Sequence, residues 1–247
     1  MQNSPQIPLN RFGPLGRGLL YVSLASSIYY LLGPFMIRWF LTAPPSDQFE
    51  SAMTFFKTLS VSALALIVLQ ILRRRDSVLL GAALALGSLG DFLLSARHGE
   101  YFVFGLISFL LGHLLYIALF FSYWPKPGVV IGWKRALIIM LLLVAAALMW
   151  WMLPLSGGLT VPVTIYYCVL TTMVIAATLA DFTGQKVVIG AGLFFISDSL
   201  IGLSRFTHVM GGLTTGFLIW STYYLAQYLI AFGFIGEKLD RERSGKA

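Results

Sequence analysis

The stretch Leu89–Tyr116, LGDFLLSARHGEYFVFGLISFLLGHLLY, decides the fold. It contains the end of one apolar segment, a short polar turn and most of the next apolar segment. A carboxylate, Asp91, lies near the end of the first segment, and an imidazole, His113, lies inside the second. Such segments are typical of membrane-spanning helices, and ionisable groups inside a membrane are costly and usually functional.

The same pattern of apolar runs and short polar turns extends over the whole chain. Of its 247 residues, 58% are hydrophobic and 11% are charged, whereas soluble domains carry about 25% charged residues. Alternation of apolar and polar residues with a period of two is absent, and an open sheet cannot face lipid. The composition therefore predicts an all-α protein, a polytopic membrane helix bundle.

Eight segments reach the length needed to span a bilayer, about 20 mostly apolar residues. The first, 18–40, has no small-residue cleavage site after a short apolar core, so we interpret it as an uncleaved helix and not as a signal peptide. Turn residues separate the segments, most clearly at Pro44-Pro45, 73–76, 125–128 and 156–158. The predicted spans are 18–40, 51–72, 77–96, 100–122, 134–153, 159–180, 187–204 and 211–235.

Basic residues lie mainly on one side of these predicted helices. Thirteen Lys and Arg residues fall on the side of the two termini and three on the other side, with Lys57 inside the membrane. The positive-inside rule therefore predicts cytoplasmic termini. We expect a cytoplasmic N-terminal arm, 1–17, an eight-helix transmembrane domain, 18–236, and a basic cytoplasmic tail, 237–247. This placement argues against nucleic acid as the reason for the net charge of +7.

The sequence offers little for a metal site or a disulfide. Cys168 is the only cysteine, so no disulfide can form within the chain. The histidines, His98, His113 and His208, are far apart, and no C-x-x-C or H-x-x-x-H pattern occurs. We therefore expect no structural zinc site, and we expect no other cofactor.

A weak internal repeat relates the two halves of the chain. A shift of 107 residues superposes Asp91 on Asp198 and Tyr116 on Tyr223. Four spans followed by four in the same orientation would be related by a pseudo-two-fold axis along the membrane normal. Chance also produces a few such matches, so a true repeat and coincidence both stay open. A true repeat would place both aspartates near the shared axis.

Glycines punctuate the third and seventh segments and allow helix backbones to approach closely. We therefore expect these two segments to be central in the bundle. The glycines are Gly81, Gly87, Gly90, Gly190 and Gly192.

Three ionisable residues fall at compatible depths in the outer half of the bilayer. At a rise of 1.5 Å per residue, Asp91 lies about 21 Å along its span and Asp198 about 16 Å along its own, and Lys57 lies about 9 Å below the outer surface. We therefore predict a polar cavity enclosed by the second, third, sixth, seventh and eighth segments. Further polar residues near the same level or mid-membrane are Tyr166, Tyr223, Tyr224, Gln227 and, somewhat deeper, His113.

Most of these residues also have a simpler interpretation. Lys57 could extend to the outer interface, and Asp91 could cap the end of its helix. His113 could be a hydrogen-bonded packing residue, and Arg205 could be an exposed loop residue or could meet a phosphate at the outer surface. Asp198 is harder to dismiss, because neither end of its segment is close.

Two carboxylates in a cavity of low dielectric constant cannot easily both be ionised. The one that stays protonated is a general acid, and its ionised partner can orient water or stabilise a cation. Lys57 would offset the remaining charge or meet a phosphate. Intramembrane Asp and Lys residues also mark ion and substrate pathways. A proton-coupled transporter or a lipid-binding membrane protein is therefore the competing hypothesis.

Four short motifs follow one another along the chain: Leu89–Leu94, Phe109–Tyr116, Phe194–Leu200 and Tyr223–Gln227. In these motifs the chain resembles the YhhN family of membrane proteins, the lysoplasmalogenases, and the resemblance runs from the second segment through the eighth. Lys57 stands where the family carries a lysine in its second span. Thr58 follows it where the family usually has proline, so this helix is expected to be less kinked.

The resemblance implies hydrolysis of the vinyl ether bond of a lysoplasmalogen, which yields a fatty aldehyde and glycerophosphoethanolamine or glycerophosphocholine. The reaction passes through an oxocarbenium ion, the type of cation that paired carboxylates manage in glycosidases. We expect one of Asp91 and Asp198 to donate the proton and the other to stabilise the cation and activate water. The expected partners are a lysophospholipid and the lipids of a bacterial inner membrane. The expected substrate-binding residues are Lys57, Tyr166, Tyr223, Tyr224, Gln227, His113 and Arg205.

Overall fold

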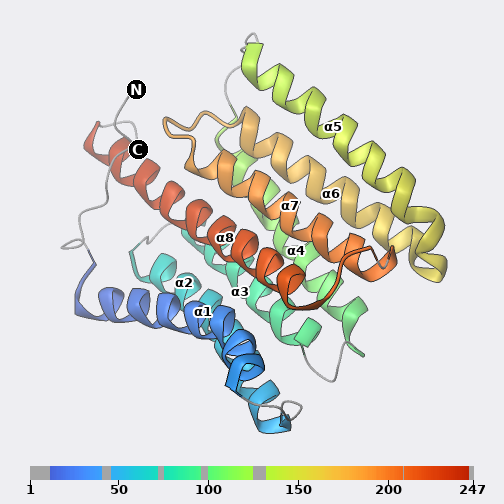
Figure 1. Ribbon diagram of the computed structural model, residues 1–247. Helices are drawn as coiled ribbons and strands as arrows, with labels where there is room; N and C mark the ends of the chain where they lie inside the picture. The colour runs from blue at the N-terminus through green and yellow to red at the C-terminus, as the bar shows by residue number, and fades with distance from the viewer. Residues whose placement is uncertain are drawn as a thin grey trace. The chain divides into compact units, whose positions relative to one another are not determined.

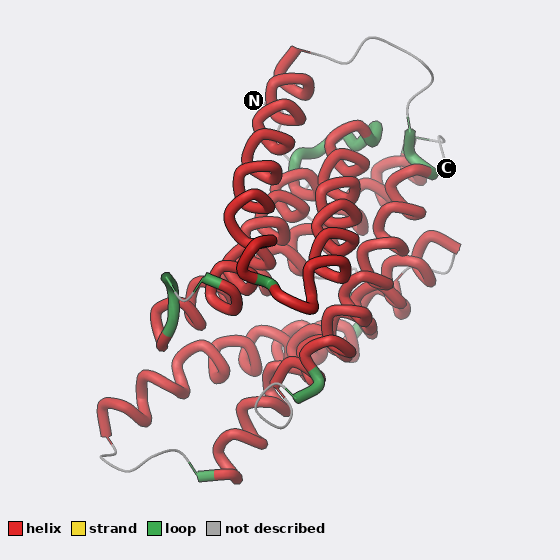
Figure 2. Tube along the Cα trace, turned by 90° about the vertical axis from the view of Figure 1, so that its right-hand side faces the viewer, coloured by secondary structure: helices red, strands yellow, loops and turns green. Residues whose placement is uncertain are grey.

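The computed structural model describes residues 12–40, 46–71, 75–95, 100–124, 132–207 and 209–244. Within these ranges the backbone forms helices and loops and no strand (Figure 2). The helices, labelled in Figure 1, are α1 (Pro14–Phe40), α2 (Asp47–Ile71), α3 (Arg75–Ser95), α4 (Phe102–Phe121), α5 (Gly132–Met152), η3 (Leu153–Leu155), η4 (Gly157–Leu159), α6 (Thr160–Leu179), α7 (Lys186–Phe206) and α8 (Gly212–Arg243).

The eight α-helices are each long and apolar enough to cross a membrane, with mean hydropathy between 1.3 and 2.6 over their most apolar stretches. These segments form helices because a backbone inside hydrocarbon must satisfy its own hydrogen bonds. The prediction of an all-α chain with eight spans is therefore confirmed for the part of the chain that the structure describes. The predicted breaks at Pro44-Pro45 and 125–128, and the first half of the one at 73–76, lie outside it, whereas Arg75 and Asp76 already belong to α3.

The predicted break at 156–158 is confirmed. It lies between the 3-10 helices η3 and η4, which separate α5 from α6. Gly157 has a φ of 54°, a left-handed conformation that residues with a side chain rarely adopt. The Ser156 hydroxyl donates a hydrogen bond to the Leu153 carbonyl at 2.8 Å. The turn chemistry of the sequence thus accounts for the end of α5.

Many hydroxyl groups in the helices are satisfied within their own helix. Thr58 donates to the Thr54 carbonyl at 2.9 Å, and Thr178 donates to the Val174 carbonyl at 2.8 Å. Bonds from a residue to the carbonyl four positions earlier remove most of the cost of a hydroxyl in apolar surroundings. Threonines and serines therefore fit these helices without a functional role, whereas aspartate and lysine need partners from other helices.

The chain folds into two compact units, which we describe separately. Unit 1 comprises residues 1–112 and 231–247, and unit 2 comprises residues 113–230. Helices α1 to α3 belong to unit 1, and helices α5 to α7 belong to unit 2. Helices α4 and α8 contribute residues to both units.

In unit 1, α2 packs against both α1 and α3 (Figure 1). The Ser23 hydroxyl of α1 donates to the Ser60 carbonyl of α2 at 2.6 Å. Helix α4 approaches α3 closely at Gly112, where an added Cβ would lie 3.2 Å from the Ala83 carbonyl oxygen. Small residues at this contact let the two backbones come together.

The last turns of α8 also belong to unit 1. The helix continues to Arg243, beyond the predicted end of the span at 235, so most of the predicted basic tail is helical. Glu237 is buried and accepts a hydrogen bond from Arg241 at 2.7 Å. Lys238 forms an ion pair with Asp76 at the start of α3. The ion pair between Lys238 and Asp76 holds the end of α8 against the start of α3.

In unit 2, α5, α6 and α7 pack against one another (Figure 1). Helix α7 comes close to α8 at Gly190. A Cβ added there would lie 2.9 Å from the Ala226 carbonyl oxygen and 3.1 Å from the Ile230 nitrogen. A Cβ added at Gly192 would meet no described atom within 4 Å. The expected close approach therefore occurs at Gly190 and not at Gly192.

This difference gives a matched pair of variants on one helix. Gly190→Ala should destabilise the protein by about 1–3 kcal/mol, because its methyl group would overlap backbone atoms of α8 that cannot move aside. Gly192→Ala should leave stability nearly unchanged. Thermal unfolding of the purified proteins in detergent measures both effects. Equal melting temperatures for the two variants would contradict the packing described for α7 and α8.

Candidate active site

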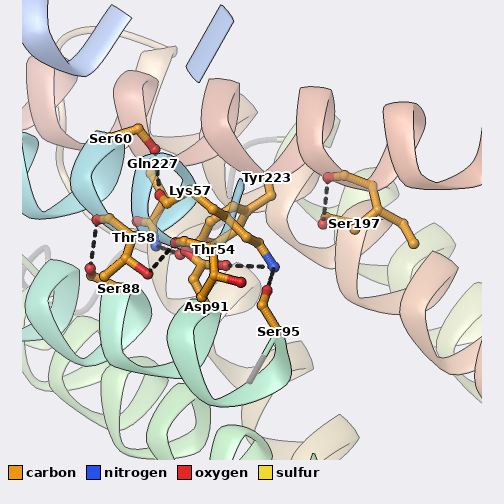
Figure 3. Close-up of polar contacts among 11 residues, drawn as sticks. Thr54, Lys57, Thr58, Ser60, Ser88, Asp91, Ser95, Ser197, Tyr223 and Gln227 are labelled. Carbon is orange, nitrogen blue, oxygen red and sulfur yellow. Dashed lines mark hydrogen bonds and ion pairs between the residues drawn. The ribbon is translucent and has the colours of Figure 1, made fainter. Parts of the chain in front are cut away.

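The first polar cluster lies in unit 1 between α2 and α3. The Lys57 ammonium lies 3.4 Å from an oxygen of Asp91 and donates a hydrogen bond to Ser95 at 3.3 Å (Figure 3). It also lies 5.7 Å from the centre of the Tyr30 ring of α1. The structure therefore brings Lys57 and Asp91 together, as their depths in the sequence predicted. A buried charge is tolerable when it is paired in this way.

A line of hydroxyl bonds along the same interface sets the register of α2 on α3. Ser88 of α3 donates a hydrogen bond to the Thr58 carbonyl at 2.8 Å (Figure 3). Its oxygen accepts one from Ser62 at 2.7 Å. Lys57 directly precedes Thr58, and Asp91 follows Ser88 by three residues, nearly one helical turn. The hydroxyl bonds thus place the ammonium opposite the carboxylate.

The second polar cluster lies in unit 2 around Asp198 of α7. The Tyr166 hydroxyl of α6 donates a short hydrogen bond of 2.5 Å to the Oδ2 atom of Asp198. The Nε2 atom of His113, from α4, lies 3.7 Å from the same oxygen. All three side chains are buried. The structure thus places three of the predicted site residues in contact at one point inside unit 2.

The ring of His113 is fixed by edge-to-face packing. Its centre lies 5.4 Å from that of Tyr166 and 4.7 Å from that of Phe194. The 3.7 Å separation from Asp198 exceeds a normal hydrogen bond but is short enough for an ion pair. A phenol, a carboxyl group and an imidazole therefore meet at one point, with the phenol in hydrogen-bond contact with the acid and the imidazole slightly farther away. His113 has the packing role that the sequence allowed, and it also faces the acid.

A hydrogen-bonded chain connects α4 and α8 beside this cluster. The Tyr116 hydroxyl donates to the side-chain oxygen of Gln227 at 2.5 Å. The amide nitrogen of Gln227 donates to the Tyr223 hydroxyl at 3.2 Å (Figure 3). The Tyr223 ring contacts Phe194 at 5.3 Å between ring centres. Gln227 and Tyr223 therefore support the wall that carries Asp198.

Sequence reasoning did not assign Tyr116, Tyr30 or Ser95, which are polar residues of these clusters. Tyr116 follows His113 by three residues, so the 3.6-residue period of a helix places both on one side of α4. That spacing was a usable signal. Tyr30 lies on α1, and its position in the sequence gives no sign that it lies near Lys57. Only the packing of α1 against α2 brings the two residues together.

Three residues that the sequence singled out remain to be placed, Tyr224, Arg205 and His208. Tyr224 stacks on Trp220 with ring centres 5.9 Å apart. Arg205 is exposed in the last turn of α7, about 10 Å along the helix from Asp198 at the usual rise. His208 lies outside the described residues. Neither Tyr224 nor Arg205 is part of the clusters described here, so a role in substrate binding stays a prediction for both.

Two further expectations from the sequence concern the pairing of the two aspartates and the absence of a metal site. Asp91 belongs to unit 1 and Asp198 to unit 2, so the predicted pairing of the two acids stays a prediction. Among the residues that the structure describes, no group of three or more His, Cys, Asp or Glu side chains is arranged to hold a metal ion.

Comparison with known proteins gives two kinds of match. The YhhN family matches residues 52–234. Proteins named lysoplasmalogenase from Mycobacterium bovis and Mycobacterium tuberculosis are each 36% identical to the chain over 155 residues. The match covers 62% of this chain and 58% of each relative, which is less than two thirds of the relatives' length. No solved structure gives a significant match.

The Lys57–Asp91 pair can be tested by its energetics. Lys57→Met keeps the length of the side chain and removes its charge, so it leaves the Asp91 carboxylate buried without its ammonium partner. We expect a loss of roughly 3–5 kcal/mol of stability. The double variant Lys57→Met/Asp91→Asn should recover much of this loss, because neither charge remains. Thermal unfolding of both variants measures the coupling, and additive losses would contradict the ion pair.

Proposed function

The chain belongs to the YhhN family, and from that premise we propose that it is a membrane lysoplasmalogenase. It would hydrolyse the vinyl ether bond of a lysoplasmalogen to a fatty aldehyde and glycerophosphoethanolamine or glycerophosphocholine. The observation that carries this proposal is the buried carboxyl group of Asp198, held by Tyr166 and facing His113. The printed names of the two mycobacterial relatives support the substrate class.

The reaction requires a proton on carbon and one molecule of water. The acid transfers its proton to the second carbon of the alkenyl chain, and the double-bond electrons form the new C–H bond. The positive charge on the first carbon is shared with the ether oxygen. Water adds to that carbon and loses a proton, which gives a hemiacetal. Protonation of the glycerol oxygen, cleavage of its bond to carbon and loss of the proton from the hemiacetal hydroxyl then release the aldehyde and a free glycerol hydroxyl.

Asp198 is the proposed proton donor. The Tyr166 hydroxyl occupies the Oδ2 atom, so the other oxygen can carry the acidic proton. A carboxylic acid in buried surroundings can stay protonated at neutral pH and act as a general acid. After the transfer, the hydrogen bond from Tyr166 would stabilise the Asp198 carboxylate until it regains its proton. His113, 3.7 Å away, would help to return that proton.

Asp91 stands in a different setting. The Lys57 ammonium 3.4 Å away would offset the negative charge of its carboxylate. We therefore assign to Asp91 the second role of the predicted pair, stabilisation of the cation and activation of water, and to Lys57 the orientation of the headgroup. The joint action of the two aspartates on one substrate rests on the sequence, because they belong to different units.

The finer features of the membrane arrangement are proposals of the same kind. The excess of basic residues on one side supports cytoplasmic termini, with the arm 1–17 and the tail 237–247 on that side of the domain 18–236. The shift of 107 residues supports a repeat of four spans. The bacterial sources of the relatives support a bacterial inner membrane as the location.

The two aspartates are tested by removal of their acidity. Asp198→Asn and Asp91→Asn should each lower aldehyde release from lysoplasmenylethanolamine by about 10²–10⁴-fold, the usual contribution of general acid–base groups. Asp181→Asn is the matched control, because Asp181 is exposed after the end of α6, and it should keep its activity. Helical content and elution as a single species verify folding.

Each outcome of this assay decides something. Full activity in the Asp198 variant would remove that residue from the mechanism. Full activity in the Asp91 variant would remove the second role assigned above. No aldehyde from the unmodified protein, together with proton-dependent uptake into vesicles, would instead favour the transporter.

The hydrogen bond to Asp198 has its own test. Tyr166→Phe removes only the hydroxyl, and hydrogen bonds to charged groups contribute about 1.5–3 kcal/mol. We expect kcat to fall by roughly 10- to 100-fold and KM to change little, because the phenol acts on the acid and not on the lipid. Tyr21→Phe, at an exposed position of α1, is the control. An unchanged kcat in the Tyr166 variant would contradict this role.

A further inference from the structure

Unit 2 contains an apolar groove that the mechanism does not use. It has a volume of about 520 Å³ and lies between α5, α6 and α7. That volume is within the range of pockets that hold small ligands, roughly 300–1,000 Å³. Residues that line it include Met140 and Val144 of α5, Val174 of α6, and Ile189, Gly192 and Phe195 of α7.

The groove is open along one side. Met140, Val144 and Ile189 are 56%, 43% and 50% exposed, although they line it. Gly192 keeps its middle clear, because a Cβ added there would meet no described atom within 4 Å. A side chain of ordinary size at this position would occupy the hollow. The groove therefore suits a flexible hydrocarbon chain that enters from the side.

The groove follows α7 toward the candidate acid. Its lining on α7 runs from Gln185 to Ile196, about 16 Å at the helical rise. Ile196 precedes Asp198 by two residues. One end of the groove thus reaches the turn of α7 that carries the acid, although Ile196 and Asp198 lie on nearly opposite sides of the helix, since two residues turn it by about 200°. The other end lies at the start of the helix.

Two aromatic residues join the groove to the Asp198 cluster. Phe195 lines the groove, and its ring packs edge-to-face on Tyr167 with ring centres 6.0 Å apart. Tyr167 is adjacent in sequence to Tyr166, the residue that donates to Asp198. The Tyr167 hydroxyl is buried and lies beside the Ser199 hydroxyl, with which it interacts. The neighbouring Ser199 hydroxyl is already donated to the Phe195 carbonyl at 2.6 Å.

Phe195 and Tyr167 therefore connect the groove with the Asp198 cluster. We propose that the groove binds the single hydrocarbon chain of the lysolipid substrate and that Tyr167 contacts this chain next to the vinyl ether. This inference rests on the proposed function. It deepens that function, because the groove would align the reactive end of the chain with Asp198 and would measure the length of the chain.

The chain-length profile tests the groove. Gly192→Phe fills it about 9 Å along the helix from Asp198, so kcat/KM for an 18-carbon alkenyl chain should fall at least tenfold, whereas an 8-carbon chain should still react within about twofold of the unmodified protein. Gly216→Phe is the matched control. Gly216 is exposed on α8, and an added Cβ there also meets no described atom within 4 Å. Retained turnover of the short chain shows that the variant folds.

An identical chain-length profile in both glycine variants would overturn the proposed role of the groove in binding the hydrocarbon chain and would leave the proposed function standing. Absence of aldehyde from the unmodified protein with every chain length would instead overturn the proposed function. The groove then has a readout of its own.

This second readout uses a saturated ether lysophospholipid with a diazirine in the middle of its chain, which cannot be hydrolysed. Light should attach it to peptides that contain Met140 or Ile189, and Gly192→Phe should lower the yield. Labelling that lies elsewhere would contradict the proposal. Labelling that a two-chain phospholipid removes as well as the lysolipid does would also contradict it, because the groove would then hold ordinary bilayer lipid.

Discussion

A polar group inside an apolar helix must find its partner within the protein, and the candidate active site depends on this constraint. Hydrocarbon offers no hydrogen bonds, so an unpaired charge there is costly. The Lys57 ammonium meets the Asp91 carboxylate at 3.4 Å, and Tyr166 donates to Asp198 at 2.5 Å. Each contact joins two different helices, α2 with α3 and α6 with α7. The same contacts that make the acids tolerable also fix their orientation.

The two clusters differ in what surrounds the acid. Asp91 has a cation as its neighbour, whereas Asp198 has a phenol and an imidazole as neighbours. In the proposed mechanism this difference gives the two identical side chains different tasks, because an acid that keeps its proton and one that has lost it do different work. Edge-to-face packing of His113 against Tyr166 and Phe194 adds rigidity to the second cluster. Rigid placement matters because a proton donor acts only within hydrogen-bond reach of its target.

The groove of unit 2 relates the apolar part of the protein to its chemistry. A lysolipid has one hydrocarbon chain and one polar end, and its reactive bond lies where the two meet. In unit 2 an apolar groove runs along α7 to the turn that carries Asp198, and the buried hydroxyl of Tyr167 lies where the two features meet. The absence of a side chain at Gly192 keeps the groove open. Specificity for a lysolipid would then follow from the fit of one chain, because hydrocarbon gains little by moving from lipid tails into an equally apolar surface.

The sequence by itself determined the helices and the ionisable candidates. Eight apolar runs with short polar breaks can satisfy their backbones in a membrane only as helices, and Asp91, Asp198 and Lys57 are visible because charge is rare in such runs. The sequence also indicated that Lys57 and Asp91 could be partners, since they fall at similar depths on consecutive helices. Only the tertiary structure decided that Tyr166 and His113 both face Asp198 and that Tyr30 lies near Lys57, because rotation of a helix about its axis is set by packing against its neighbours. The different surroundings of Gly190 and Gly192 have the same cause, since both look alike in sequence while one meets α8 and the other lines a groove.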